Sequence, residues 1–285
     1  MILCDTIVLW TWVNNFIKES IMQLFHHPLS FNSQKVRIAL EEKQVDYWPT
    51  RVNPIKARNL DPDFFRQNPD GTIPVLINGQ TVMNDTLAIL QYIDSINQPL
   101  GGERVKRDLV HSWLLKIDAW DSKPFTLSHY PEKVLQFFSR FRRRVVIARM
   151  AKFPDLAEKY HAKLNNMHEL EARRLDSEAV TANKQQLIDI LDAADVELTN
   201  SKYLCGQDFS MADVAFIPVL ARIEQLPQGA SLIEDRKRVS EYWLRMKERP
   251  SYKAAIGKYA TKLGRVKLIV PAICNVSARR LFGRY

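Results

Sequence analysis

The apolar pattern of this chain changes once, at residues 98–102, where the sequence reads Gln-Pro-Leu-Gly-Gly. Ahead of this segment, short strand-like runs alternate with helical ones, and beyond it every periodic run is helical. Because proline and glycine interrupt both helices and strands, we interpret residues 98–104 as a linker. The chain is then predicted to divide into an N-terminal extension (1–21), an α/β domain (22–97), an all-α domain (105–257) and a tail (258–285).

The first domain is predicted to follow the order β-α-β-α-β-β-α. Strands are expected at residues 23–26, 46–52, 73–77 and 81–83, and helices at 34–43, 61–67 and 85–96. Asn32 or Ser33 is the expected N-cap of the first helix, Pro62 opens the second, and Asn78-Gly79 is typical of a tight hairpin turn. Two strands joined through a helix and followed by a hairpin predict a mixed four-stranded sheet with helices on its faces.

In the second domain, helices are predicted from about residue 103, over residues 184–198, and after Ser210. A long charged region, residues 131–183, separates the first two and is interpreted as helical. Ser210 and Asp213 have the spacing of a capping box, in which each side chain reaches the other's backbone N–H. Phe209 and Val214 are expected to pack as the hydrophobic staple of that helix.

The net charge of +9 is concentrated at the end of the chain. Residues 258–285 contain seven basic residues and no acidic one, so the preceding 257 residues carry about +2. A nucleic-acid-binding protein would spread its basic residues over a folded face. The run Arg142-Arg143-Arg144 also lacks the interleaved aromatic residues that stack on bases. No nucleic-acid partner is therefore expected.

Cysteine usage and the chain ends indicate a reducing, cytoplasmic environment. Cys4, Cys205 and Cys274 lie too far apart in sequence for a disulfide framework or a metal-binding motif. The oily segment 1–21 has Asp5 in place of a basic region and no small-residue cleavage site, which argues against a secretory signal. In the tail, the apolar stretch 268–278 is interrupted by Pro271 and is far short of the roughly 20 residues that cross a bilayer.

Four segments, in order, resemble those of serine-type glutathione transferases. They are residues 26–40 (HHPLSFNSQKVRIAL), 68–76 (NPDGTIPVL), 84–86 (NDT) and 206–213 (GQDFSMAD). The arginine-rich interhelical region and the ending Arg280-Leu281-Phe282-Gly283-Arg284-Tyr285 are most similar to the plant class named after tetrachlorohydroquinone dehalogenase. The architecture also resembles the ganglioside-induced differentiation-associated proteins, which end in a membrane-directed tail.

The resemblance implies the glutathione transferase fold, a thioredoxin-like glutathione-binding domain followed by an all-helical domain. It implies a catalytic role for Ser30, whose hydroxyl would stabilise the glutathione thiolate beside the first helix. The alternative is that Ser30 is an ordinary loop serine and Ser33 caps the helix; Ser33 is also the second candidate for the activating hydroxyl. His26 and His27 receive no role from the resemblance.

The remaining glutathione contacts also follow from the resemblance. A cis Pro74 would turn the backbone of Ile73 towards the cysteinyl unit, whereas a trans proline would open an edge strand. Asp85 and Thr86 would hold the γ-glutamyl ammonium and carboxylate at a helix N-terminus, besides capping that helix. Asn59 and Thr72 are placed near the glycyl carboxylate. Lys56 or Arg58 is the candidate that would compensate for their weak side chains.

The predicted function is conjugation of the glutathione thiolate to small hydrophobic electrophiles, with glutathione as co-substrate and no cofactor or metal. Conjugation or peroxide-type thiol chemistry is expected and reductive dehalogenation is not, because Asn32 occupies the position of the cysteine that dehalogenation requires in the namesake enzyme. The alternative is a non-catalytic module attached to a protein partner or, through residues 258–285, to an anionic membrane surface. A homodimer is usual for the fold, and the lengthened interhelical region leaves the oligomeric state open.

Overall fold

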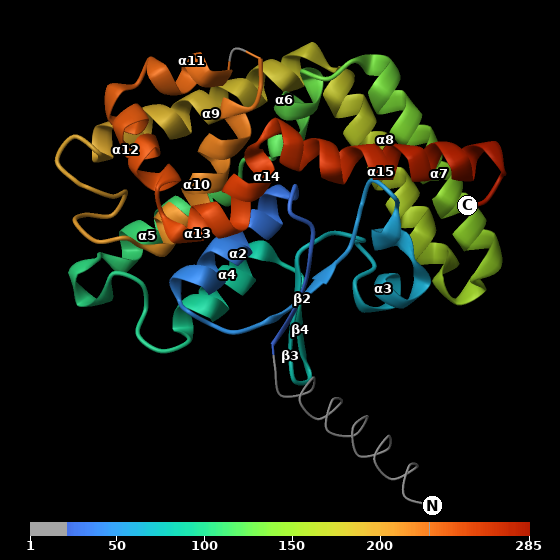
Figure 1. Ribbon diagram of the computed structural model, residues 1–285, viewed down its shortest axis with the longest axis horizontal. Coiled ribbons are helices and arrows are strands. Elements are labelled where there is room, and N and C mark those ends of the chain that lie inside the picture. Colours follow the sequence, from blue (N-terminus) through green and yellow to red (C-terminus); the bar gives the residue numbers. More distant parts are fainter. Residues whose placement is uncertain (1–21, 228) are drawn as a thin grey trace, which may run out of the picture.

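The computed structural model describes residues 22–227 and 229–285, so the predicted extension at residues 1–21 lies outside the described residues. The sheet near the N-terminus has four strands in the order β2-β1-β3-β4. They are β1 (Gln23–His26), β2 (Trp48–Arg51), β3 (Val75–Asn78) and β4 (Thr81–Met83). β1 runs parallel to β2, while β1–β3 and β3–β4 are antiparallel pairs. The predicted mixed sheet is therefore confirmed (Figure 1).

The helices that cover the sheet begin close to their predicted positions. They are α2 (Phe31–Glu42), α3 (Pro62–Gln67) and α4 (Thr86–Ser95), and a 3-10 turn that was not predicted, η1 (Arg58–Leu60), precedes α3. The predicted cap of the first helix is wrong, because α2 begins at Phe31 and Ser30 is its N-cap. Ser30 Oγ accepts a hydrogen bond from the Ser33 N–H at 3.3 Å, so Asn32 and Ser33 lie inside the first turn.

Beyond residue 98 the described chain contains helices and no named strand. After η2 (Gly102–Arg104), the helices that form the inner part of this half are α5 (Arg107–Asp118), α6 (Ser122–Ser128), α9 (Ser177–Glu197), α10 (Met211–Glu224), α11 (Gly229–Glu234) and α12 (Lys237–Lys247). The prediction that a long helix starts near residue 103 is wrong: Glu103 lies in the separate 3-10 turn η2, and Lys106 precedes α5. α9 begins earlier than predicted, because Asp176 caps it.

The predicted capping box is present at the start of α10. The Ser210 N–H and hydroxyl both donate to Asp213 Oδ2 at 2.9 Å. The Leu204 N–H and the Tyr242 hydroxyl donate to the other carboxylate oxygen at 3.0 Å. With four donors, the buried Asp213 carboxylate joins α10 to α12 and to the preceding loop.

The charged region forms a helical hairpin that packs on the α/β domain. Its helices are α7 (Glu132–Lys152) and α8 (Ala157–Leu175), joined through η3 (Pro154–Leu156). Tyr160 of α8 stacks on Phe65 of α3 with 4.1 Å between ring centroids, and its hydroxyl donates to the Leu60 carbonyl at 2.8 Å. Arg149 pairs with Asp61 at 3.0 Å. The hairpin is therefore fixed to η1 and α3 by buried aromatic and polar contacts.

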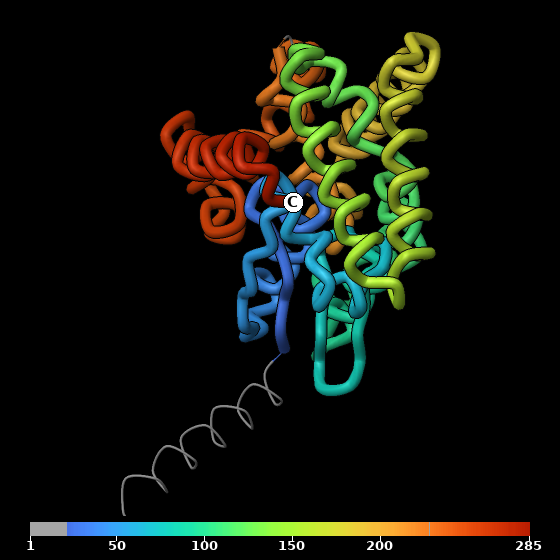
Figure 2. Tube along the Cα trace, turned by 90° about the vertical axis from the view of Figure 1, so that its right-hand side faces the viewer, coloured from blue at the N-terminus to red at the C-terminus, as the bar shows by residue number. Residues whose placement is uncertain are grey.

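The C-terminal segment is helical and folds back on the molecule. It contains α13 (Pro250–Tyr252), a π-helical turn η4 (Lys253–Gly257), α14 (Lys258–Ala260) and α15 (Lys262–Leu281). Val276 of α15 is fully buried beside Phe141 of α7. Figure 2 shows α15 (red) and the α7–α8 hairpin (green to yellow) on either side of the α/β domain (blue). The inner face of α15 is therefore packed against the rest of the protein. In the described ranges, no helix has the length and apolarity needed to cross a membrane.

Candidate active site

A cleft of about 340 Å³ lies where the loop before β3, the N-termini of α2 and α4, and the end of α5 meet. Four of the seven predicted site residues line it: Thr72, Ile73, Asp85 and Thr86. These residues come from the two sides of the β3–β4 hairpin, which brings the start of β3 close to the start of α4. The predicted γ-glutamyl and cysteinyl contacts thus share one cavity.

Ser30 is half-buried and is not among the lining residues, but it contacts Ile73, which is one of them. Its hydroxyl donates to the Ile73 carbonyl at 3.4 Å while its oxygen accepts from Ser33 N–H. The Ser30 N–H is bonded to the His27 carbonyl at 2.9 Å, which closes the loop after β1. The side chain is therefore oriented by the first turn of α2 and directed at the turn before Pro74.

The Ile73–Pro74 peptide bond is cis, as the resemblance implied. Val75, the next residue, begins β3 and pairs with Phe25 of β1. Ile73 itself precedes the strand and lines the cleft. Its backbone is thereby held beside Ser30 and at the cleft wall.

Asp85 and Thr86 occupy the N-terminus of α4. Asp85 is the N-cap, and its Oδ1 accepts from the Ala88 N–H at 2.7 Å. Thr86 is the first helical residue and is buried. A helix N-terminus carries free N–H groups and a partial positive charge, and here it faces a cleft. This end of the cleft is suited to a carboxylate.

Asn59 lies apart from the other predicted site residues. It is buried beneath the loop before β3, where its side-chain amide donates to the Gly71 carbonyl at 2.6 Å. Thr72 does line the cleft, and its carbonyl and hydroxyl oxygens both accept from the Asn68 amide, at 2.9 and 3.1 Å. Asn59 thus positions the loop, and its contact with a glycyl carboxylate stays a prediction.

The structure adds lining residues that the sequence interpretation missed. They are Asn32, Asp70, Asn84 and Asp118. Asp118 ends α5, and no local motif in the sequence marks it. The Asp118 carboxylate interacts electrostatically with the ammonium of Lys35. The Lys35 residue is 2 % exposed, and its ammonium lies 4.4 Å from the Phe31 ring centroid. Burial lowers the pKa of Lys35 to about 8, although the Asp118 carboxylate opposes this shift.

The two histidines at the end of β1 are buried and neutral. Burial lowers the pKa of His26 to about 3, with further contributions from Arg37, Arg51 and His27. Burial and the nearby Arg51 lower the pKa of His27 to about 4. His27 Nδ1 accepts from the Leu29 N–H at 3.3 Å, so His27 shapes the loop that presents Ser30.

A mixed sheet with a cis-proline turn beside a serine-capped helix, followed by a helical half, defines the thioredoxin-like class of glutathione-binding folds. The family model for the glutathione S-transferase N-terminal domain matches residues 24–99, and that for the C-terminal domain matches residues 146–250. Glutathione S-transferase TCHQD from Arabidopsis thaliana is 42 % identical over 267 residues, covering 93 % of this chain and 100 % of the relative. The chain belongs to the glutathione S-transferase family, a family of enzymes.

More distant similarities agree with this. Tetrachloro-p-hydroquinone reductive dehalogenase from Sphingobium chlorophenolicum is 27 % identical over 238 residues, covering 82 % of this chain and 95 % of that protein. Among solved structures, a glutathione transferase family member from Pseudomonas fluorescens, with two glutathione bound, has a TM-score of 0.60 at 20 % identity. That match covers 83 % of this chain and 92 % of the other, and it shows the shared fold.

Proposed function

We propose that this protein conjugates the thiolate of glutathione to small hydrophobic electrophiles, with Ser30 as the residue that stabilises the thiolate. The observation that carries the proposal is the contact between the Ser30 hydroxyl and the Ile73 carbonyl at 3.4 Å. It joins the N-cap of α2 to the cis-proline turn at the edge of the cleft. A cysteinyl unit paired with the Ile73 backbone would bring its sulfur next to this hydroxyl.

The energetic requirement matches what these groups supply. A free thiol has a pKa of about 8.5, and lowering it by two units needs about 2.7 kcal/mol of selective stabilisation of the anion. A hydrogen bond to a charged group contributes roughly 1.5–3 kcal/mol. The N-terminus of α2 adds about 0.3–1 kcal/mol. One hydroxyl in this position is therefore sufficient.

The other end of the tripeptide is assigned to Asp85 and Thr86. The γ-glutamyl carboxylate would accept from the Thr86 N–H and hydroxyl at the start of α4. Its ammonium would pair with the Asp85 carboxylate, which is exposed and lines the cleft. The proposed reaction has no thiol–disulfide step. Asn32, in the first turn of α2, has no thiol that could form a disulfide with glutathione.

The test is the ultraviolet absorbance of bound glutathione thiolate as a function of pH. Ser30→Ala is expected to raise the pKa of the bound thiol by about 1–2 units and to lower kcat/KM about 10- to 100-fold. Ser30→Asp separates the two roles of this side chain, because aspartate caps a helix but cannot donate to a thiolate and repels it. Both variants should lose thiolate formation, while Ser30→Asp keeps its melting temperature.

The matched control is Ser95→Ala, which removes an exposed hydroxyl bonded only to the Tyr92 carbonyl at the end of α4. Wild-type protein that binds no glutathione, or a Ser30→Ala variant with unchanged thiolate absorbance and rate, would contradict the proposal.

A second proposed function is peripheral attachment to an anionic membrane through α15, and the exposed side of that helix favours it. Leu263, Val266, Val270 and Ile273 recur at helical spacing and are 39–64 % exposed. The segment from Lys258 contains seven basic residues and no acidic one. Basic residues near an anionic leaflet contribute about 1 kcal/mol each. An apolar stripe bordered by such residues is typical of helices that lie in a membrane interface.

Deletion of the tail would also remove buried contacts of α15, so substitutions on its exposed side are the sharper test. The double variant Val266→Gln/Val270→Gln is expected to sediment several-fold less with vesicles containing phosphatidylserine, at an unchanged melting temperature. Val196→Gln, an exposed apolar residue on α9, is the matched control. Wild-type protein that stays in the supernatant at low salt would refute the attachment.

We further propose that the protein is cytoplasmic, with a fraction attached peripherally to a membrane. We propose a homodimer, the assembly usual for this fold. Light scattering on a size-exclusion column distinguishes it from a monomer of 33.1 kDa.

A further inference from the structure

Four arginines gather around Tyr259 of α14, beside the loop that presents Ser30. Arg51, at the end of β2, donates to the Tyr259 hydroxyl at 3.0 Å. Arg37 of α2 lies 5.8 Å from the Tyr259 ring centroid. Tyr259 and Arg222 of α10 line the same small recess, and Arg265 of α15 donates to Gln225, which also lines it.

None of these four guanidinium groups has a carboxylate within 4.0 Å in the part of the chain that the structure describes. Arg37 donates to the carbonyls of Ala254 and Ala255, at 2.9 and 2.7 Å, and Arg222 donates to the Leu29 carbonyl at 2.9 Å. Other arginines of the protein do form ion pairs, such as Arg249 with Glu42 at 2.6 Å. Beside the Ser30 loop, these four arginines therefore lie without a carboxylate partner among the described residues.

Buried polar atoms without partners lie in the same place. Both ring nitrogens of His26, which is 4 % exposed, lack a hydrogen-bond partner among the described residues. The same holds for Nε of the buried Arg37. Buried polar groups are hydrogen-bonded in most native proteins, so such atoms beside unpaired cations call for a ligand. The ligand that fits arginine groups is an oxyanion, and a carboxylate accepts two parallel N–H bonds from one guanidinium.

The position of the cluster relates it to the reaction. Arg222 holds the carbonyl of Leu29, the residue before Ser30. The recess that Arg222 shares with Leu29 and Tyr259 has a volume of only about 10 Å³, roughly the space of one water molecule. A recess of this size holds a water molecule and no carboxylate, so a ligand would meet the cluster outside it. Arg51 is exposed, so the cluster is open to solvent on its side of β2.

We propose that this cluster, Arg51 with Arg37, Arg222 and Tyr259, binds the carboxylate of the electrophilic acceptor, so that the enzyme acts on acceptors bearing an anionic group. This assignment rests on the proposed function, because it places the acceptor beside a thiolate held at Ser30. It narrows the acceptor class from hydrophobic electrophiles in general to organic acids with an electrophilic carbon. No bond changes at the cluster, which only positions the acceptor.

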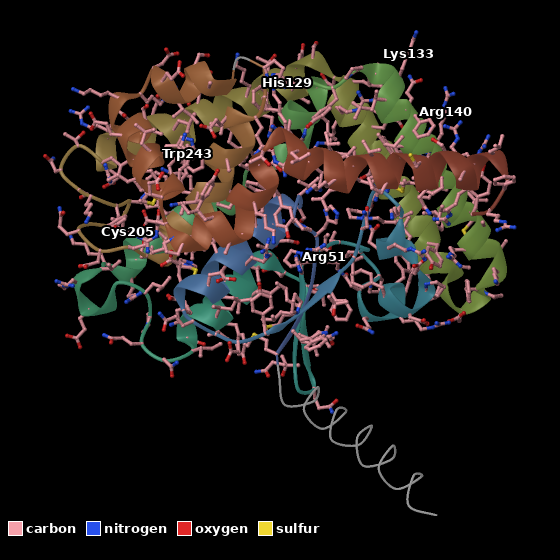
Figure 3. The ribbon with its side chains drawn as sticks, viewed as in Figure 1. Arg51, His129, Lys133, Arg140, Cys205 and Trp243 are labelled. Carbon is pink, nitrogen blue, oxygen red and sulfur yellow. The ribbon has the colours of Figure 1, made fainter. Side chains whose placement is uncertain are left out.

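The test compares two glutathione conjugates that differ only at the end of the S-alkyl chain, S-hexylglutathione and S-(5-carboxypentyl)glutathione. Dissociation constants of both, and of glutathione itself, are measured by calorimetry with the wild type and with Arg51→Gln. Arg51 is suited to substitution because, within residues 22–227 and 229–285, its side chain hydrogen-bonds to Tyr259 alone. Arg140→Gln on α7 is the matched control. Figure 3 labels both residues, with Arg51 near the centre of the molecule and Arg140 on the distant hairpin.

We expect Arg51→Gln to raise the dissociation constant of the carboxylated conjugate about tenfold, which corresponds to about 1.4 kcal/mol. The dissociation constants of S-hexylglutathione and glutathione should stay unchanged. Arg140→Gln should change none of the three. Tyr259→Phe, which removes the hydroxyl that orients Arg51, should weaken binding of the carboxylated conjugate alone.

Three results would overturn the assignment, and they are distinguishable. If Arg51→Gln lowers the affinity for all three ligands equally, Arg51 binds the glycyl carboxylate of the tripeptide instead. If the wild type binds glutathione and Arg51→Gln binds the carboxylated conjugate as tightly as the wild type does, the cluster is not a carboxylate site. The transferase proposal would then remain intact. A wild type that binds none of the three ligands would overturn the transferase proposal itself, and the acceptor assignment with it.

Discussion

At the scale of single residues, the N-terminus of α4 combines a structural and a proposed binding role in adjacent side chains. The Asp85 carboxylate caps the helix through the Ala88 N–H, which leaves its second oxygen for a ligand ammonium. Thr86 is buried yet lines the cleft, so its hydroxyl has a fixed direction. Substitutions at Thr86 should therefore change ligand binding more than folding.

Thr86→Val keeps the shape of the side chain and removes the hydroxyl. We expect the KM for glutathione to rise about tenfold, because one hydrogen bond to a charged carboxylate is lost, with little change in kcat at saturation. Initial rates at varied glutathione concentration measure this. Thr81→Val on the exposed strand β4 is the control. An unchanged KM would remove Thr86 from the γ-glutamyl site.

The sequence was informative about the cleft wherever a contact depends on a local motif. Ile73 and Thr72 adjoin Pro74, and Asp85 and Thr86 open a helix, so neighbouring residues mark them. Asp118 could not be predicted, because it reaches the cleft from the last turn of α5 and only tertiary packing brings it there. The cap of α2 was misassigned because Ser30, Asn32 and Ser33 all have side chains that cap helices well, and only geometry selects among them.

At the scale of elements, Tyr160 is one of the residues that fix the α7–α8 hairpin to the α/β domain. Burial raises the pKa of Tyr160 to about 12, so its hydroxyl stays protonated and donates to Leu60 at any physiological pH. The ring also stacks on Phe65, with 1° between the planes. One side chain thus links the hairpin to η1 and α3, the segment that leads into the loop before β3.

Tyr160→Phe retains the stacked ring but leaves the Leu60 carbonyl without its buried donor. We expect a loss of about 1–3 kcal/mol in the free energy of unfolding, because an unsatisfied buried acceptor costs this much. Urea denaturation followed by tryptophan fluorescence measures it. Tyr130→Phe, at an exposed position, is the control. A difference between the two variants below about 0.5 kcal/mol would contradict the structural role of this hydroxyl.

At the scale of the whole molecule, stability should fall in mild acid because of the buried histidines. His27 has an ordinary pKa of 6.5 when unfolded and about 4 when folded. Below pH 6.5, His27 binds a proton in the unfolded chain but not in the folded one. Its contribution to the free energy of unfolding is therefore fully present above pH 6.5 and decreases as the pH falls towards 4. The limit for this one group is about 3 kcal/mol.

His27→Gln should therefore lose less stability than the wild type between pH 6.5 and 4, as measured by melting temperature across that range. The exposed His111→Gln is the matched control. Identical pH dependence in wild type and His27→Gln would show that folding does not lower the pKa of His27.

Most of the overall architecture could be predicted from periodicity and turn chemistry, down to the four strands and the hairpin at Asn78-Gly79. What the sequence left open was the placement of the long arginine-rich region and of the tail. Their periodicity favours helices, but their docking depends on single distant partners: Phe65 and Leu60 for α8, and Phe141 for α15. Amphipathic patterns indicate that a face is buried and not what covers it.

Arg37 has a bearing on how the protein is made. Its guanidinium donates two hydrogen bonds to carbonyls 217 and 218 positions later in the chain. Domains generally fold as units during synthesis, N-terminal first. Here the half that emerges first from the ribosome carries a buried cation whose partners are translated only near the end. Nascent chains stalled before Ala254 should therefore remain more sensitive to protease around α2 than chains released in full.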